Sequence, residues 1–169
     1  MSTSLARCAE FLTVDGVRHH VDGAEAVIRI VFVTQQYLNQ RGEKLAVLRL
    51  ETPDDGHRCR VSIERAFPVG SNPAATCLKL CRLAAATPLV AVEYDEDFEN
   101  LRMICETVVE DGEVTRLQLL SMIDRLVEAT EWWHGAITSA HRQKGSPRGT
   151  RGRAKGARLA RGKDGLNAA

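Results

Sequence analysis

The sequence predicts an α+β protein, in which an antiparallel sheet carries its helices on one face. Two observations predict this class. Residues 57–65 alternate between apolar and polar side chains, which is typical of an antiparallel strand with one face in water. Residues 115–137 repeat apolar side chains at helical spacing, which predicts a long helix packed along one side. The expected element order is α-β-β-β-α-β-β-α, followed by a disordered basic C-terminal tail.

The first half of the chain predicts one helix and three main strands. Apolar spacing and turn residues place a helix at 4–13, a short extended segment at 17–21 and strands at 26–34, 44–51 and 57–65. Asp15-Gly16 ends the helix. In the third strand, the alternation directs Cys59, Val61 and Ile63 toward the interior and the intervening polar residues toward water.

The second half carries clear helix-start signals around a hairpin. The predicted elements are a helix at 73–86, strands at 88–94 and 99–107, and a helix at 115–137. Asn72 is placed to cap the first helix, with Pro73 at its first position. Thr115 and Gln118 have the spacing of a capping box. The apolar contacts of the helix at 73–86 are expected from Leu78, Cys81, Leu83 and Ala85. In the hairpin, Val90, Val92 and Tyr94 are expected against Leu101, Met103 and Cys105.

The region from 73 to 137 resembles the second half of YbjN-type proteins, within the type III secretion chaperone-like superfamily. The matching segments are Leu78–Leu83, Leu89–Asp95, Leu101–Met103 and Glu113–Gln118. Residues 4–65 fit the helix and three-strand opening of that family. The resemblance implies a compact α+β domain that often dimerises, binds protein segments or has a regulatory role, and it implies no enzyme activity.

Charge is distributed unevenly along the chain. From His141 onward there are nine basic residues and one acidic residue, a formal charge of +8, so residues 1–140 carry −7 within the total of +1. The C-terminal segment also has few large apolar residues to offset the entropy of ordering it. We therefore expect a folded domain at 1–140 and a disordered basic tail at 141–169.

Composition and motifs point away from several classes of protein. Because the N-terminus lacks a basic segment leading into an apolar run, and no apolar run is long enough to cross a bilayer, the expected location is the cytoplasm, without a membrane contact. The five cysteines lack the spacing of a metal site and are expected as free, buried thiols. His134 is expected to cap the end of the last helix. No phosphate-loop or nucleophile motif is present, so neither catalytic residues nor a cofactor or metal is predicted.

Two binding surfaces remain as hypotheses of function. The first is a protein-binding surface on the last helix. Its two adjacent tryptophans point about 100° apart, so they are not expected to share one core. Its expected residues are Trp132, Trp133, Leu119 and Ile123. This favours a non-enzymatic module, chaperone-like or regulatory, that acts as a homodimer or binds a protein client.

The alternative is a nucleic-acid-associated accessory protein that contacts RNA or DNA through the tail. Mobile positive charge neutralises phosphates, but the tail has no aromatic residue to stack on bases, so this binding would be weak and non-specific. The expected contact residues are Arg148, Arg151, Arg153, Lys155, Arg158 and Arg161. Solubilisation, or docking of the tail on the acidic domain, are further roles compatible with its charge.

Overall fold

The structure is a computed structural model that describes residues 2–70, 72–96, 99–110 and 112–144, with side chains through Ile137. Within these residues it has three α-helices and a six-stranded antiparallel sheet, which confirms the predicted α+β class. The helices are α1 (Leu5–Val14), α2 (Pro73–Ala85) and α3 (Arg116–Lys144). The strands are β1 (His19–Asp22), β2 (Val27–Val33), β3 (Leu45–Glu51), β4 (Arg58–Pro68), β5 (Ala91–Asp95) and β6 (Asn100–Val108), and a short 3-10 turn, η1 (Asp54–Gly56), precedes β4.

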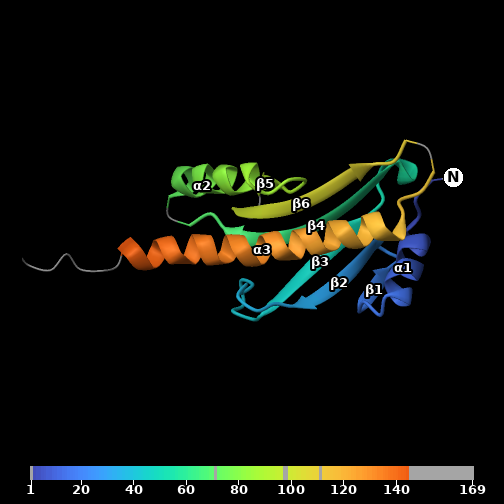
Figure 1. Cartoon of the computed structure of the whole chain (residues 1–169), viewed down its shortest axis with the longest axis horizontal. Coiled ribbons are helices and arrows are strands. Elements are labelled where there is room, and N and C mark those ends of the chain that lie inside the picture. Colours follow the sequence, from blue (N-terminus) through green and yellow to red (C-terminus); the bar gives the residue numbers. More distant parts are fainter. Residues whose placement is uncertain (1, 71, 97–98, 111, 145–169) are drawn as a thin grey trace, which may run out of the picture.

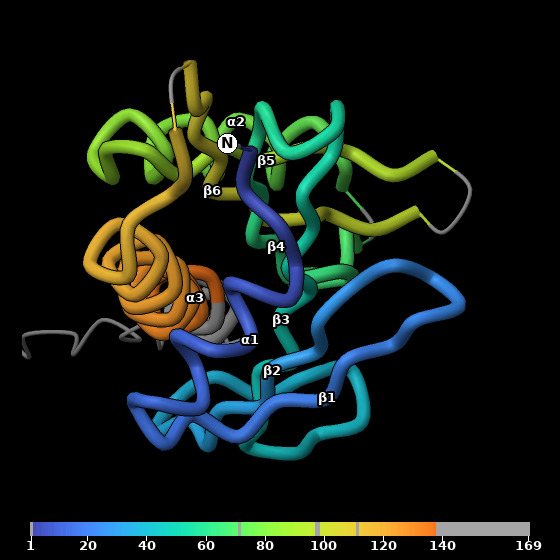
Figure 2. The backbone as a smooth tube through the Cα atoms, turned by 90° about the vertical axis from the view of Figure 1, so that its right-hand side faces the viewer, coloured from blue at the N-terminus to red at the C-terminus, as the bar shows by residue number. Residues whose placement is uncertain are grey.

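The sheet is covered by helices on one side. Its strand order is β1-β2-β3-β4-β6-β5, so β6 inserts next to β4 and β5 forms the outer edge. Helix α3 runs across the strands (Figure 1), and the end-on view places all three helices on the same side of the sheet (Figure 2). The core therefore lies between α3 and the inner sheet face, with α1 covering β1 and β2, and α2 beside β5.

Local signals in the sequence correspond to local structure. Along β4, Cys59, Val61 and Ile63 are buried as predicted, in contact with the core, whereas Ser62, which was expected to face water, is fully buried. The capping box of α3 is reciprocal: the Thr115 hydroxyl accepts from the Gln118 amide at 3.2 Å, and the Gln118 side chain accepts from the Thr115 amide at 2.9 Å. These bonds explain why the helix begins where it does.

The hairpin register and the stripe of α3 also agree with expectation. Val92 lies opposite Met103 and Tyr94 opposite Leu101. The asparagine cap of α2 is present as well, since the Asn72 side chain accepts from the Ala75 amide at 3.1 Å. On α3, the predicted stripe supplies buried core residues at Leu119, Ile123, Leu126, Thr130 and Trp133.

Three local expectations differ from the structure. The segment expected only as a short extended piece forms β1, which pairs along β2 and adds a strand to the predicted order. Strand β5 begins at Ala91, not at residue 88, because Leu89 has a positive φ of 68° that turns the chain before the strand. Helix α3 continues to Lys144, past the predicted end at 137.

Helix α2 packs through a face that only partly matches the expected one. Leu80 is its buried residue and Leu83 packs against the core as predicted, whereas Leu78, Cys81 and Ala85 are exposed. The helix has several small or apolar residues, so more than one apolar stripe is compatible with its sequence. Contact with β5 and α3 selects the face that carries Leu80.

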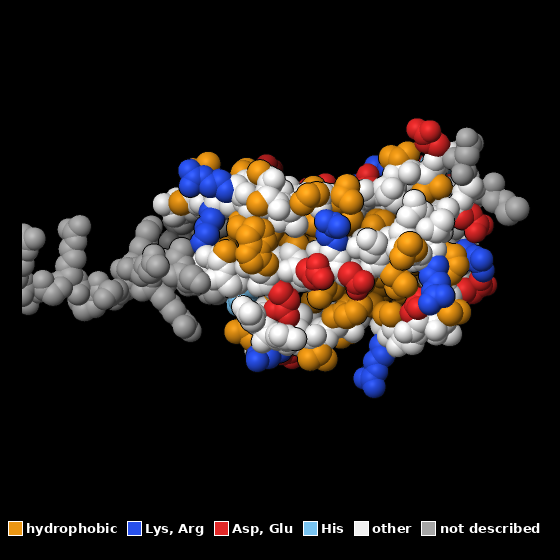
Figure 3. All heavy atoms as spheres, in the orientation of Figure 1, with side chains coloured by type: hydrophobic (Ala, Val, Ile, Leu, Met, Phe, Trp, Pro, Cys, Tyr) orange, Lys and Arg blue, Asp and Glu red, His pale blue; other side chains and the backbone are white. Residues whose placement is uncertain are grey.

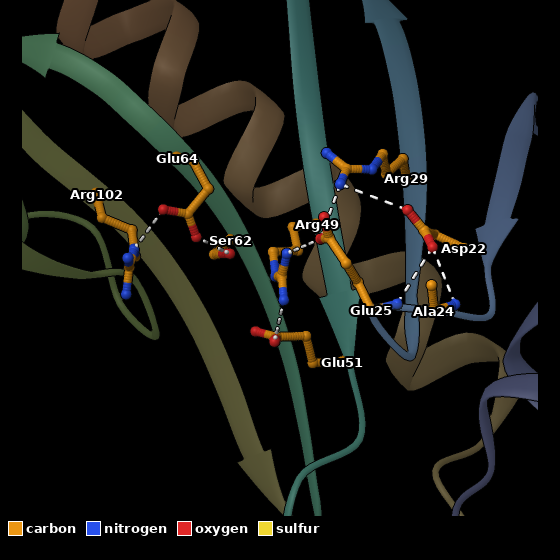
Figure 4. Close-up of polar contacts among 9 residues, drawn as sticks. All are labelled: Asp22, Ala24, Glu25, Arg29, Arg49, Glu51, Ser62, Glu64 and Arg102. Atoms are coloured by element: carbon orange, nitrogen blue, oxygen red, sulfur yellow. Dashed lines mark hydrogen bonds and ion pairs between the residues drawn. The ribbon is translucent and has the colours of Figure 1, made fainter.

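The outer face of the sheet carries paired charges. Glu25 bonds both Arg29 and Arg49 at 2.8 Å, and Arg102 bonds Glu64 at 2.8 Å (Figure 4). Arg102 also lies 3.5 Å from Asp95, so the acidic β5–β6 hairpin is partly neutralised within the fold. Among the described residues, the basic side chains Arg29, Arg49 and Arg102 on this face are each paired with a carboxylate.

Candidate protein-binding surface

The structure separates the four residues that the sequence grouped as a binding surface. Leu119, Ile123 and Trp133 are buried in the core, whereas Trp132 keeps 50% of its surface exposed. The Trp133 indole donates to the Thr87 hydroxyl at 3.1 Å, which ties α3 to the chain after α2. Of the four, only Trp132 is available to a partner on the folded surface.

Trp132 lies in a groove on one flank of α3. We call it the Trp132 groove; its volume is about 750 Å³ and its lining residues are Val33, Gln35, Gln36, Val127, Glu128, Glu131, Trp132, Gly135 and Ala136. Val33, at the end of β2, is 83% exposed. The space-filling view of the α3 face shows apolar side chains beside acidic ones along this helix (Figure 3). The groove thus combines exposed apolar surface with carboxylates.

Glu131 holds the loop that borders the Trp132 groove. Its carboxylate accepts the backbone N–H groups of Gln36 and Tyr37, each at 2.7 Å, and also that of Gln35. Partial burial alone would raise the pKa of Glu131, but these three donors, with a smaller contribution from His134, hold it below its ordinary value. An ionised glutamate on α3 therefore holds the chain that follows β2.

Tyr37 anchors the same loop from the inside. It is buried, donates its hydroxyl to the Ala66 carbonyl at 3.0 Å, and meets Phe67 edge-on with ring centroids 5.9 Å apart. Burial raises its pKa to about 12, so the phenol stays protonated as a donor. The loop that borders the groove is consequently fastened at both its backbone and its side chain.

His134 has a packing role in place of the expected capping role. Because α3 continues to Lys144, His134 lies well inside the helix, with its ring 5.5 Å from Tyr37 and 6.5 Å from Phe67, centroid to centroid. Burial lowers its pKa, against an opposing effect of Glu131. The prediction was wrong because the end of the helix was placed too early.

The cysteines are distributed differently from the expectation of five buried thiols. Cys8, Cys59 and Cys105 are buried, Cys77 is half-buried and Cys81 is exposed. Within the described residues, no group of three or more His, Cys, Asp or Glu side chains has the arrangement of a metal site. These residues accordingly supply no argument for metal chemistry.

The remaining sequence expectations concern the tail and membranes. The six basic residues expected to bind nucleic acid, from Arg148 to Arg161, lie outside the described residues. Among the helices that are described, none combines the length and apolar character needed to span a bilayer.

Sequence reasoning missed the bond between Glu131 and the loop after β2. Its partners are 94 to 96 residues away along the chain, so no local pattern reports it. The only available signal was an acidic residue beside the exposed tryptophan.

The fold defines a class: α+β domains with a single antiparallel sheet, one helix-covered face and a long C-terminal helix. Within this class the chain has a YbjN-type fold. It superposes on the crystal structure of YbjN from E. coli, provisionally described as a transcription regulator, with a TM-score of 0.57 and 15% sequence identity, over 82% of this chain and 93% of that one. No protein-family model matches the sequence, and no curated protein sequence matches it.

Proposed function

We propose that this chain is a non-enzymatic protein-binding module, chaperone-like or regulatory, that forms a homodimer through the Trp132 groove. The observation that carries the proposal is the half-exposed Trp132 beside the exposed Val33, in a groove whose border is already fastened. The regulatory description of YbjN is compatible with a binding role.

The exposure of Trp132 is not needed by the fold. The core-facing stripe of α3 is complete without it, because Trp133, Leu126 and Ile123 already fill the space over the sheet. A large aromatic side chain left beside exposed aliphatic surface is typical of an interface, where tryptophan frequently contributes most of the binding energy. Trp132 is therefore the residue on which we place the contact.

The loop that borders the Trp132 groove is already held in place, which favours binding without rearrangement. A loop that must be ordered on association costs conformational entropy, which lowers affinity. Here Glu131 and Tyr37 already hold the chain after β2 against α3. A second copy of the chain can thus bury Trp132 and Val33 at a low ordering cost.

Sedimentation velocity over a range of concentrations tests the dimer. The parent should associate, Trp132→Ala should shift toward the monomer, and Leu117→Ala should behave like the parent. Leu117 is a matched control, since it is 78% exposed on the same helix but outside the groove. A parent that stays monomeric, or a Trp132→Ala variant that associates as the parent does, would contradict the proposal.

A second function is supported by the charge of the tail. The +8 carried by residues 141–169 favours contact with phosphate backbones, and the provisional description of YbjN as a transcription regulator is compatible with such a contact. The test is binding to RNA or DNA at increasing salt, with the six predicted contact residues replaced by serine. Binding that is insensitive to salt and to these substitutions would exclude the tail as the contact.

A further inference from the structure

A second cavity lies beside the N-terminal half of α3, facing β6 and the chain between α2 and β5. We call it the Arg125 pocket. Its volume is about 380 Å³, and its lining includes Leu89, Cys105, Thr107, Leu117, Met122 and Arg125. This volume is within the range of small-molecule sites in proteins.

The unusual feature of this pocket is its arginine. The Nε atom of Arg125 is buried and has no hydrogen-bond partner within the described part of the chain. A guanidinium carries a permanent charge, and a buried donor without a partner is costly. Among the described residues, no other buried side-chain nitrogen or oxygen lacks a partner. The pocket therefore has a cationic donor that lacks an acceptor.

Neighbouring carboxylates do not supply that acceptor. Glu106 also borders the pocket, but its carboxylate bonds Arg60 and lies 3.3 Å from Arg58 on the outer side of the sheet. Arg125 also acts on the Cys105 thiol. Burial raises the pKa of Cys105, and the positive charge of Arg125 opposes that rise. Arg125 is thus close enough to influence a thiol that lines the pocket, while the carboxylate of Glu106 pairs with Arg60.

The pocket is partly open, and its apolar side chains lie beside the polar Thr107, Gln118 and Ser121. Leu117 and Leu89 are 78% and 71% exposed at its rim, and Met122 is buried in its wall. Leu89 has a φ of 68°, a left-handed conformation that non-glycine residues rarely adopt. Exposed leucines beside a cationic donor suit a ligand with an apolar part and an anionic head.

We propose that the Arg125 pocket binds a small amphipathic carboxylate, with the carboxylate on the Arg125 guanidinium and the apolar chain between Leu89, Leu117 and Met122. The charge of the guanidinium attracts the carboxylate, and the chain covers the leucines at the rim. The site is separate from the Trp132 groove, so it stands whether or not that groove forms a dimer.

Titration of the full-length protein with octanoate, followed by backbone amide NMR, tests the proposal. Octanoate should shift the resonances of Cys105, Thr107 and the α3 residues of the pocket, whereas octan-1-ol should bind more weakly and octylamine more weakly still. Hydrogen bonds to charged groups are worth enough that Arg125→Gln should weaken octanoate binding roughly tenfold to hundredfold. Arg82→Gln is the matched control, because Arg82 is an exposed arginine on α2 outside the pocket.

A second variant separates weaker ligand binding from a loss of folding. Leu117 is largely exposed, so Leu117→Asn should leave the melting temperature unchanged while weakening octanoate binding several-fold through the lost apolar contact. Arg125→Gln should melt no lower than the parent in the absence of ligand, since it removes an unpaired buried donor. Equal affinity of Arg125→Gln and the parent for octanoate, or equal affinity of the parent for octanoate and octylamine, would overturn the proposal.

Discussion

Glu131→Gln removes a negative charge that three backbone donors share. A glutamine oxygen can still accept from the amides of Gln36 and Tyr37, but its NH₂ group then faces the amide of Gln35, donor against donor. The substitution keeps the size and shape of the side chain. Its effect therefore reports the hydrogen bonds and the charge, and not a lost packing contact.

The expected loss of stability follows from these contacts. A hydrogen bond to a charged group contributes roughly 1.5 to 3 kcal/mol, and Glu131 is partly exposed, so solvent reduces that value. We expect Glu131→Gln to lower the free energy of unfolding by about 1 to 2 kcal/mol at pH 7. Glu128→Gln, on the same flank of α3 and exposed, should change it by no more than about 0.5 kcal/mol.

The pH dependence of this loss has a definite sign. Because the folded-state pKa of Glu131 is below its ordinary value, its contribution to stability is present above the ordinary pKa and is lost as the pH falls toward the folded-state pKa. The difference between parent and Glu131→Gln should therefore shrink on acidification.

Urea unfolding at several pH values measures the loss of stability and its pH dependence. Amide hydrogen exchange at residues 35–37 measures how often the loop opens. Exchange there should accelerate in Glu131→Gln and not in Glu128→Gln. Equal unfolding free energies for the two variants, with unchanged exchange at residues 35–37, would refute the role assigned to Glu131.

Three further predictions concern the core, the tryptophan pair and the tail. Val61→Asp, at a fully buried position in β4, should lower the free energy of unfolding by roughly 3 kcal/mol or more in a urea titration, and a parent-like transition would contradict the strand assignment. Trp133→Ala should cost about 3 to 5 kcal/mol and Trp132→Ala about 1 kcal/mol or less, so similar losses for both would contradict their opposite burial. Deletion of residues 145–169 should leave the melting temperature within about two degrees of the parent, because that segment has few large apolar residues, and should abolish salt-sensitive binding to polyanions. Calorimetry and a polyanion titration check the last prediction, and an unfolded domain after the deletion would show that the tail is structural.

Much of the fold was predictable because its signals are local. The alternation along β4 identifies its inner face from Cys59, Val61 and Ile63 alone, since side chains alternate across any strand. Thr115 and Gln118 similarly predict the start of α3, because their capping bonds span a single turn. Where the local pattern was ambiguous, as on α2, only Leu83 of the four predicted contacts packs against the core.

The candidate sites were less predictable, because they depend on contacts between distant segments. The sequence indicated that Trp132 and Trp133 diverge on a helix, but which of them is buried depends on how α3 rotates against the sheet. The bond of Glu131 to the chain after β2, and the unpaired Nε of Arg125 above β6, follow only from that placement.

By itself the sequence determined the class of the fold, the helix starts, the inner face of β4 and the uneven charge of the chain. Each of these depends on periodicity, capping or composition, which act over a few residues or over the chain as a whole. The tertiary structure decided the strand order, the face of α2 and the two cavities along α3, one lined by Trp132 and the other by Arg125. These features required the structure because the free energy that selects them comes from burying side chains that are far apart in sequence.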